Sequence, residues 1–161
     1  MAQTKNTTYR VPADGFFGEL FRPDENKYQE KALICFSDSD GGIELSRTLA
    51  GVFQSRGLTP LALAYALEEG LPKRFSNIPI DFLEAAAKRL HDMGYEKVGL
   101  WGISKGAELA PTAERLLPGL VNAVIAFSPM STVCQGFAKE KWISFFPLAA
   151  CTPDSIVQLA V

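Results

Sequence analysis

The chain has 161 residues, which fits a single domain, and 47% of them are hydrophobic, which is enough to fill a core. Its 16 Lys and Arg residues nearly balance 18 Asp and Glu residues, so its charge does not favour a nucleic-acid partner. The polar residues 1–11 lack the apolar segment of a secretory signal, and the apolar stretch 142–150 is too short to cross a bilayer.

The first elements predict an antiparallel hairpin followed by a buried strand. TTYRV (7–11) and GFFGELFRP (15–23) are rich in strand-forming residues, with a turn centred on Asp14 between them. KALICF (31–36) is a continuous apolar run, which is typical of a strand buried on both faces. The loop SDSDGG (37–42) follows this strand.

The middle of the chain alternates helices with buried strands. Residues 43–57 predict a helix, TPLALAYA (59–66) predicts the next strand, and residues 79–94 predict a second helix that starts at Pro79 and stops at Gly94. The apolar face expected for the first helix consists of Leu45, Leu49, Val52 and Phe53.

The last predicted elements surround a serine. KVGLWGI (97–103) predicts a third buried strand, Ser104 follows it, a helix then runs to about Leu117, and VNAVIAF (121–127) predicts a fourth buried strand. This alternation predicts a mostly parallel sheet with helices on both faces. We therefore assign residues 1–129 to the first part of one domain. Residues 130–161 belong to the same domain but predict no clear element.

The residues Gly102-Ile103-Ser104-Lys105-Gly106 match the pattern G-x-S-x-G. In this pattern a strand turns sharply into a helix, the serine at the turn exposes a nucleophilic hydroxyl, and the glycines let strand and helix approach closely. The strand predicted before Ser104 and the helix predicted after it supply that context. The alternative is an ordinary tight turn in which Ser104 caps the helix.

A serine nucleophile also needs backbone N–H groups that stabilise the oxyanion formed during its attack. In this architecture one N–H comes from the residue after the nucleophile, here Lys105, and the other comes from the loop after an earlier strand. That loop is residues 37–42, in which Ser39 is the candidate donor. The alternative for this loop is an Asx-type turn with solvated aspartates.

WGISKGAEL (101–109), together with SDSDGG and SPMSTVCQGF (128–137), resembles the C-terminal catalytic domain of the acyl-CoA thioesterase / bile acid-CoA:amino acid N-acyltransferase family. The resemblance implies an α/β-hydrolase fold, which is a three-layer sandwich, with the antiparallel hairpin at its N-terminus. It also implies an acyl-CoA or another acyl ester or thioester as substrate. Thioesterases of the family have serine at the nucleophile position and acyltransferases have cysteine, so Ser104 favours hydrolysis over transfer.

The chain departs from this family in several respects. The aspartate and histidine of the family's triad lie on later loops, and neither can be carried over to a residue of this chain. We expect the domain to be truncated where its later strands should begin, and not to be preceded by the family's immunoglobulin-like domain. Asp38 stands where glycine is usual, and Pro111 interrupts the helix after Ser104, where it removes one backbone hydrogen bond and predicts a kink.

The sequence contains one histidine, His91, in the last turn of the predicted helix 79–94. That helix leads to the start of strand 97–103, whereas Ser104 follows its end. The length of the strand separates the two residues by about 20 Å at ~3.3 Å per residue. A general base must lie within about 3 Å of the proton that it takes, or act through one water. We therefore expect His91 to be an imidazole at a helix C-terminus, where positive charge is favourable.

Other residues are weaker candidates for the base. We expect Lys105 to point to solvent, and Glu108, one helical turn after Ser104, to brace the turn by hydrogen bonds. Asp154 follows Ser104 in the chain, as a triad acid would, but no strand end precedes it. Cys134 has no neighbour that would activate its thiol.

Three cysteines at unrelated spacings, Cys35, Cys134 and Cys151, predict reduced thiols and a cytoplasmic protein. No residue pattern predicts a metal or cofactor site, and the absence of G-x-G-x-x-G disfavours a dinucleotide-binding domain. The sequence thus predicts a serine hydrolase domain of the acyl-CoA thioesterase type, impaired because its triad acid and histidine are missing. The alternative is a non-catalytic binding domain or a fragment, which could form a homodimer through an exposed sheet edge.

Overall fold

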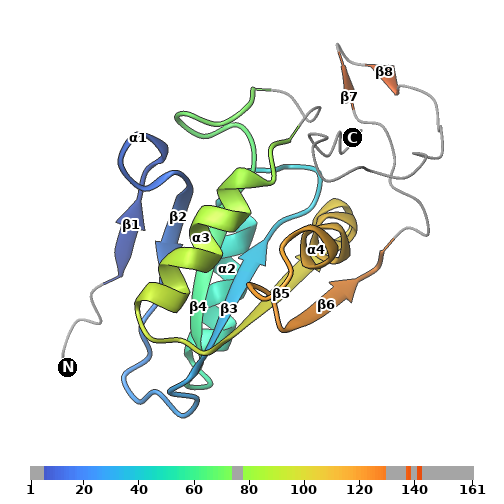
Figure 1. Cartoon of the computed structure of the whole chain (residues 1–161). Helices are drawn as coiled ribbons and strands as arrows, with labels where there is room; N and C mark the ends of the chain where they lie inside the picture. The colour runs from blue at the N-terminus through green and yellow to red at the C-terminus, as the bar shows by residue number, and fades with distance from the viewer. Residues whose placement is uncertain (1–5, 74–77, 130–136, 139–140, 143–161) are drawn as a thin grey trace.

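The computed structural model describes residues 6–73 and 78–129, together with the backbone of the two short strands β7 (Phe137–Ala138) and β8 (Lys141–Trp142) (Figure 1). Most of the predicted segment 130–161 lies outside the described residues. The expectations for Cys134, Cys151 and Asp154 lie outside them as well.

One six-stranded sheet forms the centre of the fold, with the strand order β1-β2-β4-β3-β5-β6. The first two strands and β4 pair antiparallel, whereas β4, β3, β5 and β6 are all parallel to one another. The prediction of a mostly parallel sheet with an N-terminal antiparallel hairpin is therefore confirmed. The bounds are β1 (Thr7–Tyr9), β2 (Phe17–Leu20), β3 (Lys31–Phe36), β4 (Thr59–Ala64), β5 (Lys97–Ile103) and β6 (Ala123–Phe127).

The helices cover the two faces of this sheet (Figure 1). The helices α3 (Asp81–Asp92) and α4 (Lys105–Leu116) share a buried apolar cluster on one face, and α2 (Glu44–Gln54) packs in a second cluster on the other. The short helix α1 (Val11–Asp14) occupies the turn expected between β1 and β2. Among the described residues, no helix is long and apolar enough to cross a membrane.

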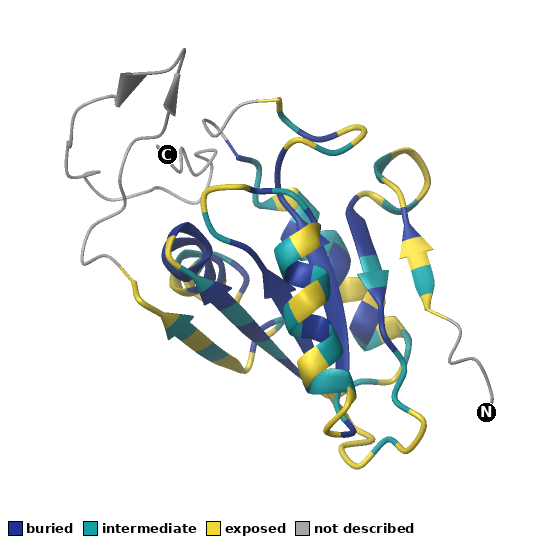
Figure 2. Cartoon of the chain, turned by 180° about the vertical axis from the view of Figure 1, so that it is seen from behind, coloured by how far each residue is buried: buried dark blue, intermediate teal, exposed yellow. Residues whose placement is uncertain are grey.

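Two predictions about burial are wrong. The helix α2 turns Ser46 and Ala50 toward the sheet, while Val52, expected on the buried face, is 45% exposed. The strand β6 is not buried on both faces, since Ile125 and Phe127 are 50% and 59% exposed. Figure 2 shows β6 in yellow and teal beside the dark-blue central strands. Helix α2 packs mainly on β4 and β3, in the middle of the sheet, and β6 lies at its edge in the described residues.

The strand order brings the carboxyl ends of two neighbouring parallel strands together. The neighbouring strands β3 and β5 are parallel, with Phe36 paired to Gly102, so both end at the same edge. The chain leaves β3 for α2 on one face and leaves β5 for α4 on the other face. In open parallel sheets this reversal places ligand sites at the carboxyl ends of the two strands. Residues 37–42 and Ser104 lie there.

Candidate functional site at the carboxyl edge of the sheet

The backbone of Ser104 is strained. Its φ is 52° and its ψ is −108°, a combination that non-glycine residues adopt at a cost of about 1–3 kcal/mol. The strain is held from both sides: the Ser104 N–H donates to the carbonyl oxygen of Phe127 at 3.0 Å, and its carbonyl accepts from the N–H of Ala107 at 3.0 Å. The residue is exposed at the junction of β5 and α4.

The two glycines of the motif are required by close backbone contacts. A Cβ atom at Gly102 would lie 2.2 Å from the carbonyl oxygen of Gly106. A Cβ atom at Gly106 would lie 2.2 Å from the carbonyl oxygen of Ser37, the first residue after β3. The glycines therefore allow β5, α4 and the loop after β3 to meet at one place, as the G-x-S-x-G pattern requires.

The alternative in which Ser104 caps α4 is wrong. Ser104 occupies the N-cap position, but its side chain makes no capping hydrogen bond. A capping serine has extended backbone angles, with a negative φ, and bonds the N–H of the second or third helical residue. Ser104 has a positive φ and an exposed side chain instead.

The loop 37–42 lies against the start of α4 and is closed by internal hydrogen bonds. The Asp38 carboxylate accepts the N–H of Asp40 at 2.9 Å, so the Asx-type turn named as an alternative is present. The Asp38 carbonyl accepts the N–H of Gly41 at 3.2 Å. Ser39 is exposed at the tip of this turn, and no described residue accepts its N–H. The structure thus brings the loop of Ser39 and the turn of Ser104 and Lys105 to one edge.

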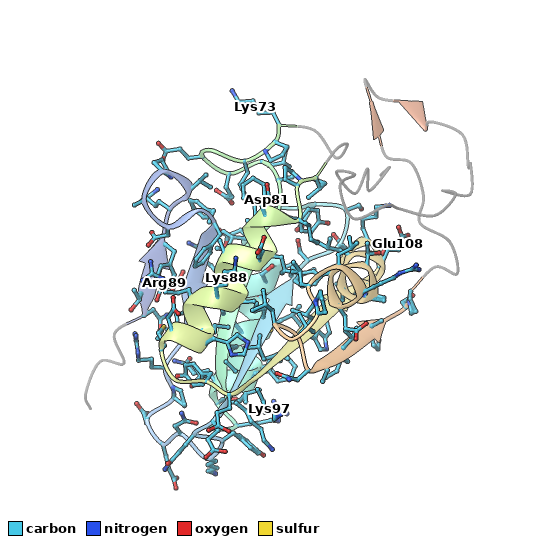
Figure 3. The ribbon with its side chains drawn as sticks, viewed as in Figure 1. Lys73, Asp81, Lys88, Arg89, Lys97 and Glu108 are labelled. Carbon is cyan, nitrogen blue, oxygen red and sulfur yellow. The ribbon has the colours of Figure 1, made fainter. Side chains whose placement is uncertain are left out.

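Lys105 and Glu108 form an ion pair beneath the turn. Nζ of Lys105 lies 2.6 Å from Oε2 of Glu108, and the two side chains are 8% and 2% exposed. The expectation that Lys105 points to solvent is wrong, whereas the bracing role of Glu108 is consistent with this pair. Figure 3 shows Glu108 on α4, at the far end of the sheet from Lys97, which begins β5. Pro111 lies within α4, which runs on to Leu116.

Two features at this edge were not predicted from the sequence. Among the described residues, the three non-glycine residues with positive φ are Leu67, Ser104 and Ser128, which follow the ends of β4, β5 and β6. The hydroxyl of Tyr65 donates to the carbonyl oxygen of Asp38, a residue far away in the chain. Of the residues named here, only Ser104 has a signal in the sequence, which is the G-x-S-x-G pattern. The positive φ of Leu67 and Ser128 and the bond from Tyr65 to Asp38 depend on how the strands are ordered.

His91 lies at the opposite edge of the sheet, as expected. Its Nδ1 is 2.8 Å from the carbonyl oxygen of Tyr95, and its Nε2 is 3.0 Å from that of Leu120. Each ring nitrogen thus faces a backbone carbonyl oxygen: that of Tyr95 lies between α3 and β5, and that of Leu120 lies before β6. The imidazole links the loops at the amino ends of the strands, and neither of its nitrogens contacts Ser104.

Neither a metal cluster nor an activated thiol is found in the described part of the chain. No group of three His, Cys, Asp or Glu side chains there could hold a metal ion. Cys35 is fully buried in β3, and this burial raises the pKa of its thiol. Because the thiolate is the reactive form, Cys35 is inert in the folded chain.

Curated proteins with sequences similar to this chain include acyl-CoA thioesterases and an N-acyltransferase. Human acyl-coenzyme A thioesterase 1 is 31% identical over 119 residues, which cover 72% of this chain and 28% of that protein. Acyl-coenzyme A amino acid N-acyltransferase 2 of Rattus norvegicus is 34% identical over 122 residues, which cover 73% of this chain and 26% of that protein. The chain thus spans about a quarter of the length of these relatives. No protein-family model matches it.

Solved structures with the same fold are α/β-hydrolases. The α/β hydrolase GrgF from Penicillium sp. sh18 superposes with a TM-score of 0.62 and 20% identity, covering 81% of this chain and 47% of that one. Dienelactone hydrolase from Anabaena variabilis superposes with a TM-score of 0.55 and 23% identity, covering 74% of this chain and 61% of that one. The predicted α/β-hydrolase fold is confirmed.

Proposed function

We propose a function on the premise that this chain belongs to the family of the acyl-CoA thioesterases and acyl-CoA amino acid N-acyltransferases. The premise applies to the segment that the chain shares with these relatives. The chain carries the nucleophile-bearing part of a domain that cleaves acyl-CoA thioesters. The observation that carries the proposal is the strained, exposed, uncapped Ser104 at the carboxyl edge of the sheet. A serine at this position favours transfer of the acyl group to water over transfer to an amino acid.

The proposed chemistry begins with Ser104. Its Oγ gives its proton to a base and attacks the carbonyl carbon of the thioester, and the carbonyl oxygen becomes an oxyanion that accepts hydrogen bonds from the N–H groups of Lys105 and Ser39. The C–S bond then breaks, the sulfur takes the proton from the protonated base so that CoA leaves as its thiol, and the acyl group stays on Ser104 as an ester. Water hydrolyses this ester to release the carboxylic acid and restore the serine.

Both steps need a base, and the described residues place no histidine beside Ser104. The sequence has one histidine, and its two ring nitrogens bond backbone at the other edge of the sheet. Without the base of a triad, an oxyanion hole and substrate binding retain only about 10³-fold acceleration over water. We therefore propose that these 161 residues alone turn over acyl-CoA slowly or not at all.

The experiment that tests this proposal is CoA release from acyl-CoAs of several chain lengths, compared between wild type and Ser104→Ala. We expect both proteins to give rates close to the background. Rapid turnover by the wild type that disappears in Ser104→Ala would contradict the missing base while supporting the nucleophile.

Imidazole in the buffer gives a second test, because it can act on Ser104 as a general base from solution. We expect imidazole to accelerate acyl-CoA cleavage by the wild type beyond its effect on Ser104→Ala, which measures cleavage by imidazole alone. Equal acceleration of the two proteins would show that Ser104 is not the nucleophile.

The exposed face of β6 favours a second candidate function, in which this part of the fold binds another copy of the chain. The strand β6 is the last of its sheet in the described residues, and its Ile125 and Phe127 side chains are exposed. An unpaired edge strand with apolar side chains is a template for pairing with an identical edge. Sedimentation of the wild type and of Phe127→Glu tests this. A dimer lost in the variant supports it, and a monomeric wild type contradicts it.

The cellular compartment stays a prediction. The three cysteines, expected to be reduced, favour the cytoplasm. One relative, 31% identical, is named a mitochondrial acyl-coenzyme A thioesterase 2. Fractionation of cells that express the full-length protein would decide between the two compartments.

A further inference from the structure

Tyr65 connects the loop 37–42 to the rest of the fold. It follows β4 directly and is 3% exposed, with its ring in the apolar cluster under α3 and α4. Its hydroxyl donates to the carbonyl oxygen of Asp38. The N–H groups of Tyr65 and Ala66 both donate to the carbonyl oxygen of Gly41, each at 3.1 Å. Tyr65 therefore holds both ends of the turn that carries Ser39.

The bond to Asp38 determines the direction of one particular N–H. The carbonyl of Asp38 and the N–H of Ser39 belong to the same peptide group, which is planar and trans. The two therefore point in opposite directions, and a donor that holds the carbonyl also fixes the N–H. The Asp38 carbonyl points inward to the buried Tyr65, so the Ser39 N–H points outward from the loop.

The remaining bonds of the loop do not replace this contact. The bonds from Asp40 to the Asp38 carboxylate and from Gly41 to the Asp38 carbonyl lie within the turn, and they would move with it. The backbone N–H groups of Tyr65 and Ala66 hold the Gly41 carbonyl from outside the turn, but they do not bond the Asp38–Ser39 peptide. In the part of the chain that the structure describes, Tyr65 is the one side chain from another element that bonds the Asp38–Ser39 peptide.

The Tyr65 hydroxyl is kept in its donating form. Burial raises its pKa, and the carboxylates of Asp40, Asp38 and Glu108 raise it further because they disfavour a phenolate. The hydroxyl therefore stays protonated at neutral pH and can donate its hydrogen to a carbonyl oxygen. Glu108 is also the residue that pairs with Lys105, the other predicted oxyanion donor.

We propose that Tyr65 is a positioning residue of the oxyanion hole: its hydroxyl orients the Asp38–Ser39 peptide group so that the Ser39 N–H faces the oxyanion formed when Ser104 attacks. This inference rests on the proposed function. It assigns the orientation of the second oxyanion donor to a buried side chain that does not touch the substrate.

The variant that tests the inference is Tyr65→Phe, which removes one oxygen and keeps the ring. A matched control is Tyr9→Phe, because Tyr9 is also buried in the same cluster and its hydroxyl bonds Sδ of Met93 instead of the loop. Acyl-CoA cleavage is measured in imidazole, with the rate of Ser104→Ala subtracted. We expect Tyr65→Phe to lower kcat by about tenfold to a hundredfold with little change in KM, because it loosens one oxyanion donor. Tyr9→Phe is expected to leave both constants unchanged.

An NMR measurement tests the positioning role of Tyr65 separately from the role of Ser104 as the nucleophile. A boronic acid that adds to a nucleophilic serine forms a tetrahedral anion at the oxyanion position. We expect this adduct to shift the amide signal of Ser39 in the wild type and to shift it much less in Tyr65→Phe. An adduct on Ser104 that leaves the Ser39 signal unmoved in the wild type, or equal shifts in both proteins, would overturn the role of Tyr65 and leave Ser104 as the nucleophile. No adduct and no Ser104-dependent rate would overturn the proposed function and this inference with it.

Discussion

The two ends of β5 differ in how their polar residues are used. At the carboxyl end, Ser104 has a strained backbone, an exposed side chain and no capping bond. At the amino end, His91 has both ring nitrogens within 3.0 Å of backbone carbonyl oxygens. The carboxyl end keeps a polar group available at a cost in stability, and the amino end uses its polar group for stability. Ser104 and His91 therefore lie at opposite ends of β5 and do not form a catalytic pair.

Breaking the buried ion pair under Ser104 should give the largest loss in the free energy of unfolding, compared with breaking an ion pair on an exposed helix surface. Replacing Glu108 with Gln removes the carboxylate of a pair whose side chains are 8% and 2% exposed, and removing one partner of a buried pair costs up to about 3–5 kcal/mol. The control is Glu84→Gln on α3, whose partner Lys88 is exposed, and which should cost about 0.3–0.5 kcal/mol. Urea unfolding measures both. Equal losses would show that the pair under Ser104 contributes no more than a surface pair.

The next prediction concerns the close approach of α4 to the loop after β3. A methyl group at Gly106 would lie 2.2 Å from the Ser37 carbonyl oxygen, so Gly106→Ala should lower stability by about 3 kcal/mol and separate the loop from the turn. At Gly51 in α2 a methyl group meets nothing within 4 Å, and Gly51→Ala should raise stability by about 0.5–1 kcal/mol. If Gly106→Ala unfolds like the wild type, the edge is not packed as described.

The amino edge should respond to mutation in stability alone. Replacing His91 with Ala removes a ring whose nitrogens lie within hydrogen-bonding distance of the carbonyl oxygens of Tyr95 and Leu120, and should cost about 1–2 kcal/mol. Its exposed neighbour Asp92 is the control, since Asp92→Ala should change stability very little. Neither variant should alter the imidazole-dependent cleavage of acyl-CoA. A loss of that cleavage in His91→Ala would remove the distinction between the two edges.

The smallest expected effect is the strain at Ser104 itself. Glycine adopts a φ of 52° without the cost that a Cβ atom imposes, so Ser104→Gly should be about 1 kcal/mol more stable than Ser104→Ala. Both variants should lose the part of the imidazole-dependent cleavage that requires Ser104. Thermal unfolding of the pair measures the difference. Equal stability would mean that the backbone at the turn relaxes when the serine is removed.

The central strands and the serine turn could be predicted because their signals are local. The apolar runs KALICF and KVGLWGI end where β3 (Lys31–Phe36) and β5 (Lys97–Ile103) end. The turn was predictable because glycine is needed on both sides of Ser104 for contacts within that turn and with the loop after β3. Local periodicity is sufficient for such elements.

The features that depend on strand order could not be predicted in this way. A continuous apolar run such as VNAVIAF looks the same in a central strand and at an edge, so the exposure of Ile125 and Phe127 was missed. The burial of Lys105 and the contact from Tyr65 to Asp38 require that β3, β4 and β5 be placed side by side. The spacing of these residues along the chain carries no signal for either contact.

The central proposal is that Ser104 is a nucleophile and that His91, the one histidine of the sequence, is not its base. Peptide mapping tests it most directly. The protein is incubated with an acyl-CoA and imidazole, quenched in acid and cut with trypsin, which releases residues 98–105 as one peptide. We predict that this peptide gains one acyl group in the wild type and in His91→Ala, and none in Ser104→Ala. An acyl group on another peptide, or one that depends on His91, would contradict the claim.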